Sequence, residues 1–187
     1  AFWWPRFERI ATWFVATESE RRRHCEAIHA EVKGQIEIAA PAGPFTLTAV
    51  ADRIERRAGG GLVIADYKTG GLPSKKDVAA GFAPQLPLEG VIAEAGGFPD
   101  IPAQAVDAIE FWRITGGMPP GEIRAATDDA QVIAGARNGL ADLVAQFDDP
   151  DTPYVARPYG DRDGRTSDYD HLARVKEWLT RGRKDET

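Results

Sequence analysis

The amino-acid sequence predicts an α/β fold in which helices flank a small mixed sheet with a hairpin at its centre. Apolar and polar residues alternate over residues 45–56, as they do in a strand. Glycines at 59–61 then turn the chain, and the apolar run at 62–68 predicts the second strand of the hairpin. Segments with helical spacing lie on both sides of this hairpin and supply the helices.

The residues before the hairpin predict a long helix and then a strand. Pro5 suits a first helical turn, and Phe7 and Ile28 lie at helical spacing. We therefore expect a helix from residue 5 to about 33. The run GQIEIAA at 34–40 begins a strand after it. Along 45–56 we expect strict alternation, with Ala51 on the opposite face from Asp52 and Ile54.

Further helices and one more strand follow the hairpin. The expected helices cover residues 77–95, with Pro84 and Pro87 near the start or at a break, 127–147 and 168–179, and the expected strand covers 105–115. We expect a single domain over 1–187, cut from a larger protein, with an N-terminal helical segment (1–33), a sheet core carrying the active site (34–115) and a C-terminal helical segment (116–187).

Composition excludes several classes of protein. The 187 residues can bury one sizeable core, and no apolar run approaches the length of a membrane-spanning helix, so we expect no membrane partner. Cys25 is the single cysteine, which excludes internal disulfides and an iron–sulfur cluster in this chain and suits a cytoplasmic protein. The net charge of −6 argues mildly against nucleic acid. Between Asp52 and Lys76, however, six basic residues outnumber three acidic ones.

Three ionisable side chains converge if the hairpin turn is centred on Gly59. Ile54 then faces Ile64, and Asp52 faces Asp66 with their Cβ atoms about 5 Å apart. Lys68 shares a face with Asp66 because side chains two apart in a strand point the same way. Two carboxylates this close need a shared proton or a cation. Mg²⁺ fits, since it binds one or two carboxylates together with waters and phosphates. This arrangement favours metal-assisted phosphodiester hydrolysis, with solvated residues at a strand edge as the alternative.

The same residues carry a resemblance to a known family. The segments TAVADRIERRAGGGLVIADYKTG and PSKKDVAAGFAPQLPLEGVIAEAGGF resemble the RecB-type branch of the PD-(D/E)xK nucleases, and within it the C-terminal nuclease domains of AddB-type subunits. AddB-type subunits pair with AddA in helicase–nucleases that process double-strand breaks. The resemblance implies a PD-(D/E)xK nuclease-like mixed central sheet with flanking helices. It also implies Mg²⁺ or Mn²⁺ as cofactor, and DNA and AddA as partners.

Site roles follow from the resemblance position by position. Asp52 and Asp66 would bind the metal, and so would the main-chain carbonyl of Tyr67. Lys68 would be the catalytic lysine. Gln85 matches the glutamine of the family's Q-x-x-x-Y motif, with Glu89 in the place of the tyrosine. From the basic segment we add Arg53, Lys75 and Lys76 as DNA contacts.

The chain departs from the family pattern at its start, where the family has a helix with a metal-binding histidine. We expect the chain to begin after that helix and to be weakly active on its own. Two other functions stay open: a DNA-binding or scaffold domain with a vestigial or incomplete site that partners AddA, and a small-molecule enzyme with Lys68 as nucleophile.

Overall fold

The computed structural model describes residues 3–154. Along the chain the elements are α1 (Trp4–Arg21), the short 3-10 helix η1 (Arg22–His24), β1 (Cys25–Ile38), β2 (Phe45–Arg57), β3 (Leu62–Lys68), α2 (Lys75–Ala79), α3 (Gln85–Glu94), β4 (Val106–Ile114), β5 (Gly121–Ala125) and α4 (Val132–Asp148). The predicted helix at 168–179 lies outside the described residues.

The five strands form one sheet in the order β1-β2-β3-β4-β5. Strands β3 and β4 are parallel, and every other neighbouring pair is antiparallel. The parallel pair requires a crossover, which α2 and α3 provide between β3 and β4. This confirms the predicted α/β class with a mixed sheet and flanking helices.

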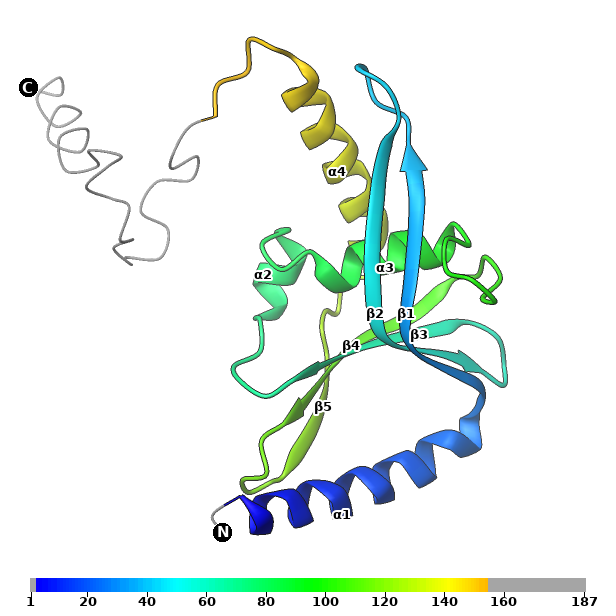
Figure 1. Cartoon of the computed structure of the whole chain (residues 1–187), viewed down its shortest axis with the longest axis vertical. Coiled ribbons are helices and arrows are strands. Elements are labelled where there is room, and N and C mark those ends of the chain that lie inside the picture. The colour runs from blue at the N-terminus through cyan, green and yellow to red at the C-terminus, as the bar shows by residue number, and fades with distance from the viewer. Residues whose placement is uncertain (1–2, 155–187) are drawn as a thin grey trace, which may run out of the picture. The chain divides into compact units, whose positions relative to one another are not determined.

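Helices cover both faces of the sheet. The main core packs Ile54, Ile64 and Ile109 of the sheet against Leu86 of α3 and Ile133 of α4. On the other face α1 lies across the strands, and Figure 1 shows α1 and α3 on opposite sides of the sheet. This sandwich leaves the central strand β3 buried along most of its length.

The hairpin of β2 and β3 has the predicted register. Ile54 pairs with Ile64 and Arg53 with Ala65, so Asp52 and Asp66 occupy the next position of the register. The turn depends on glycine, because Gly60 and Gly61 have φ of 86° and 82°. A side chain at Gly61 would also collide with the carboxylate of Asp107.

The strict alternation predicted for β2 is wrong beyond Ala51. Ala51 and Ile54 are three residues apart, and yet both pack in the main core. The change of face occurs at Asp52, opposite Glu31 of β1, which has a φ of 53°. A left-handed residue bends the β1–β2 ribbon at this point and resets which side chains face the core. Asp52 therefore lies at the bend.

The predicted helix from residue 5 to 33 is wrong after Arg21. Residues 25–38 form β1 instead, paired along its length with β2. The helical spacing of Ile28 is coincidental, since this residue pairs with Glu55 in the sheet. Inter-strand hydrogen bonds and burial outweigh local propensity over this segment.

The elements after the hairpin agree more closely with the predictions from the sequence. The helix expected over 77–95 breaks before Pro84 into α2 and α3, and the strand expected over 105–115 is β4. The helix expected from 127 begins later, at Val132, because Thr127 and Asp129 accept main-chain hydrogen bonds in a turn. Strand β5, within the segment predicted to be helical, was not predicted.

Contacts divide the chain into two units, Ala1–Asp148 and Asp149–Thr187. All the helices and strands of the described residues belong to the first unit. None of the helices within residues 3–154 combines the length and the apolar composition needed to cross a bilayer.

Candidate active site at the end of β3

An acid and a base, Asp66 and Lys68, lie on the same face of β3 at the end of its buried part. Asp66 is 3% exposed, while the side chain of Lys68 is about one-third exposed. Lys68 Nζ lies 2.7 Å from Asp66 Oδ2. This oxygen accepts no directed hydrogen bond from the described residues, so the contact is an ion pair. The ammonium group of Lys68 thus lies between the buried carboxylate and solvent.

Asp52 is fixed by the main chain between these two residues. Its Oδ2 accepts a hydrogen bond of 2.9 Å from the N–H of Tyr67. The N–H and C=O groups of one residue in a strand point toward the same edge. The carbonyl of Tyr67 therefore points toward the same strand, β2, as its N–H. Asp52 thus lies against the main chain between Asp66 and Lys68, on the side of β3 toward which the Tyr67 carbonyl points.

Gln85, the first residue of α3, joins the site from a third element. Its Nε2 donates to Asp66 Oδ1 at 2.8 Å, and its Oε1 accepts from Lys68 Nζ at 3.3 Å. The amide therefore holds the acid and the base in one arrangement. This places the predicted Gln85 beside Asp66 and Lys68.

Glu89 lies one turn further along α3 and belongs to the same cluster. Gln85 Nε2 donates to Glu89 Oε1 at 3.2 Å, while Oε2 has no hydrogen-bond partner among the described residues. The side chain is 2% exposed. Burial raises the pKa of Glu89 to about 7, and the negative charges of Asp66 and Asp52 add to this rise.

The donor set fits the predicted Mg²⁺ or Mn²⁺. Asp52, Asp66 and the carbonyl of Tyr67 offer hard oxygen atoms, and one oxygen of the buried Glu89 carboxyl has no hydrogen-bond partner among the described residues. Within residues 3–154, no three His, Cys, Asp or Glu side chains converge closely enough, as they stand, to hold a metal ion. Two carboxylates are sufficient for Mg²⁺ when waters and substrate phosphates complete the coordination.

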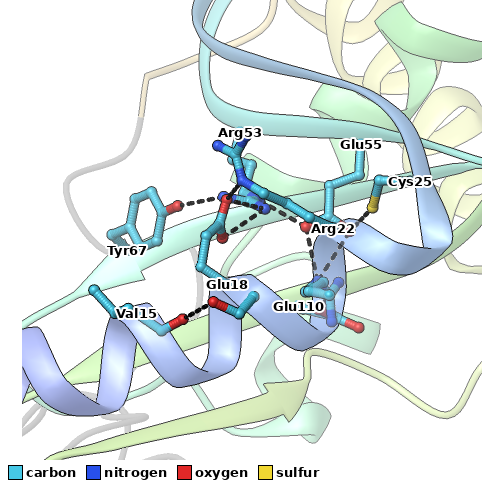
Figure 2. A network of polar contacts seen from close by, with 10 residues as sticks. Val15, Glu18, Arg22, Cys25, Arg53, Glu55, Tyr67 and Glu110 are labelled. Carbon is cyan, nitrogen blue, oxygen red and sulfur yellow. Dashed lines mark hydrogen bonds and ion pairs between the residues drawn. The ribbon is translucent and has the colours of Figure 1, made fainter.

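A buried ionic network occupies the opposite face of the same strands, and Figure 2 shows it. Arg53 Nε lies 2.6 Å from Glu55 Oε1, and Arg53 Nη2 lies 3.0 Å from Glu18 Oε2 of α1. Arg21 of α1 binds Glu55 at 2.7 Å and Glu110 of β4 at 2.6 Å. The network ties α1 to two strands of the sheet, β2 and β4.

The network contacts the active site through Tyr67. Arg53 Nη1 donates to the hydroxyl of Tyr67 at 3.3 Å, and the Tyr67 ring packs edge-on against Trp112. Arg53 itself stacks over Trp112, 5.0 Å from the ring centroid. Tyr67 therefore has its ring fixed on one face while its N–H orients Asp52.

The structure corrects the predicted role of Arg53 as a DNA contact. Arg53 is 4% exposed and its guanidinium is engaged by Glu18 and Glu55, so it is not presented to a phosphate. Lys75 is exposed but pairs with Asp128 at 2.5 Å. Lys76 is exposed at the start of α2, away from the Asp66–Lys68 pair in the chain.

Sequence reasoning missed the buried network. The signal was present in β2, where Arg53 and Glu55 lie two apart and so share a face. A similar spacing recurs in β4, where Glu110 and Trp112 share a face. Charged residues at strand positions are ordinarily taken as solvent-facing, so their partners on α1, Arg21 and Glu18, were overlooked.

Comparisons with known proteins agree with this geometry. Similar proteins include uncharacterized proteins of Rickettsia bellii, Rickettsia conorii and Rickettsia typhi, each 32% identical over 96 residues. The alignments cover 51% of this chain but only 12%, 12% and 11% of those relatives, so the chain matches a small part of much longer proteins. These comparisons do not bear on the AddB type. A family model described as "PD-(D/E)XK nuclease superfamily" matches residues 3–161. With most of its length matched and its acid–lysine pair at the end of a central strand, the chain belongs to the PD-(D/E)XK nuclease superfamily.

Proposed function

We propose that the chain is a metal-dependent DNA nuclease domain that hydrolyses phosphodiester bonds, chiefly in single-stranded DNA. One observation carries the proposal: Asp52, Asp66 and Lys68 converge at the end of β3, with Asp52 bound to the main chain of Tyr67 between the other two. Superfamily membership supports the reaction class. The DNA substrate comes from the resemblance to RecB-type nucleases.

Each residue has a distinct task in the proposed reaction. Asp52, Asp66 and the carbonyl of Tyr67 hold Mg²⁺ or Mn²⁺, which polarises the phosphate and activates water when bound. Lys68 is exposed enough to meet the substrate, and its ammonium stabilises negative charge that develops on the phosphate oxygens. In the metal-free chain, Gln85 keeps Lys68 beside Asp66 through hydrogen bonds to both.

We also propose the biological setting that the resemblance implies. The domain would act in the cytoplasm in a helicase–nuclease with AddA, where it cuts strands exposed during double-strand break repair. The second candidate is a DNA-binding or scaffold domain with an incomplete site. One observation favours it: no three side chains of the metal-ligand types are preassembled within residues 3–154.

Cleavage of labelled single-stranded DNA tests the nuclease proposal. The chain is assayed with Mg²⁺, with Mn²⁺ and with EDTA, beside Asp66→Ala and a matched control, Asp128→Ala, which removes an exposed carboxylate outside the site. We expect metal-dependent cleavage by the chain and by Asp128→Ala, and at least a hundredfold loss in Asp66→Ala. Binding without cleavage, in this chain and in a form extended at its N-terminus, would favour the scaffold.

A further inference from the structure

Glu89 is a buried carboxylate to which the proposed reaction assigns no task. It lies on α3, is 2% exposed, and has one oxygen, Oε2, without a hydrogen-bond partner in residues 3–154. A buried carboxyl oxygen without a hydrogen-bond partner is costly, and more so when the carboxyl is ionised. A positively charged ligand bound to Glu89 Oε2 would offset this cost.

The amide of Gln85 shows where such a ligand would lie. One nitrogen, Nε2, donates both to Asp66 Oδ1 at 2.8 Å and to Glu89 Oε1 at 3.2 Å. The two carboxylates thus already converge on one electropositive group. On the other side of Asp66, Oδ2 faces the ammonium of Lys68. In this structure, the Gln85 amide and the Lys68 ammonium are the hydrogen-bond donor and the cation that face these carboxylates.

We propose that Glu89 is a third protein carboxylate of the metal centre, and that Gln85 Nε2 holds the place that a hard divalent cation takes between Asp66 and Glu89. The proposal rests on the proposed function, which supplies the metal. Carboxylate oxygens are ligands that suit Mg²⁺ and Mn²⁺. Because Nε2 lies between the two carboxylates, the Gln85 amide must turn aside when the cation binds.

A Mn²⁺ titration tests this inference without measuring cleavage. Free Mn²⁺ is followed by electron paramagnetic resonance at pH 8, for the full chain, Glu89→Gln, Asp66→Asn and Glu94→Gln. Glu94 is the matched control, since it also lies on α3 but pairs at the surface with Arg137. We expect Glu89→Gln to weaken Mn²⁺ binding at least tenfold, as Asp66→Asn does, and Glu94→Gln to bind as the unchanged chain does.

The outcomes separate this inference from the function on which it rests. If Glu89→Gln binds Mn²⁺ normally while Asp66→Asn does not, Glu89 is no ligand and the metal centre stands. If Asp66→Asn binds normally, or the unchanged chain does not bind, the metal centre and this inference both fail. Circular dichroism checks folding. If Glu89→Gln is unfolded, Glu89→Met replaces it, since it keeps the side-chain length without a carboxylate, and unchanged affinity in that variant overturns the proposal.

Discussion

The buried carboxyl of Glu89 makes the stability of the metal-free protein depend on pH. Burial, together with the charges of Asp66 and Asp52, raises its pKa to about 7, against an ordinary value of 4.5. The hydrogen bond from Gln85 opposes this rise without cancelling it. Between these two pH values the folded chain keeps a proton on Glu89 that the unfolded chain has lost.

The sign and size of the effect follow from this difference in bound protons. A raised pKa means that the contribution of Glu89 to stability is present in full below pH 4.5 and is lost as pH rises through 7. The gap between the two pKa values corresponds to about 3 kcal/mol in the free energy of unfolding. Glu89→Gln removes the titrating group while keeping the shape of the side chain, so it should remove this slope.

Urea denaturation in EDTA at pH 5 and pH 8 measures the effect. We compare the unchanged chain with Glu89→Gln, because other groups that titrate then cancel in the difference. From pH 5 to pH 8, the unchanged chain should lose about 2–3 kcal/mol relative to the variant. Equal pH dependence in the two proteins would refute the reasoning, because it would mean that Glu89 is ionised in the folded chain at both pH values.

Two further predictions concern the support of the site. Arg53→Ala should lower the free energy of unfolding by about 3–5 kcal/mol in urea, since it leaves Glu55 and Glu18 short of a buried partner. The control Arg56→Ala breaks a half-exposed pair on the same strand and should cost under about 1 kcal/mol; equal losses would contradict the network. Gly97→Ala should lower the melting temperature, because its Cβ would lie 2.5 Å from the carbonyl oxygen of Gln35. Gly135→Ala, in open space on α4, should raise it, and the opposite order would show that the close approach at Gly97 relaxes freely.

The site was predictable where its chemistry is local. Asp66 and Lys68 share a face by strand periodicity, and the glycine turn fixed the register that brings Asp52 to the same position. Gln85 was placed by resemblance, and the structure shows the hydrogen bonds that put it there. These residues could be predicted from the sequence because the position of each is set by one hairpin or by one motif.

The failures come from long-range pairing. Residues 25–33 have helical spacing, but they pair with β2 in the sheet. Strand β5 lies in a glycine- and proline-rich segment and is defined by its partner β4. The bend at Asp52 arises from a left-handed residue on the neighbouring strand, Glu31, which no pattern within β2 reveals. Such features depend on contacts between residues far apart in sequence, and local periodicity does not encode them.

The two faces of the hairpin are coupled through Tyr67 and the Asp52–Arg53 step. On one face, Asp52 is held by the N–H of Tyr67, and on the other, Arg53 holds the hydroxyl of the same tyrosine. Arg53 is in turn fixed by Glu18 of α1. A helix that contributes no proposed catalytic group therefore helps to set the position of Asp52, a carboxylate proposed to bind metal. This explains why charge is buried behind the site: the ionic network orients β2 and β3 at the bend, where apolar packing alone would leave the strand faces less sharply defined.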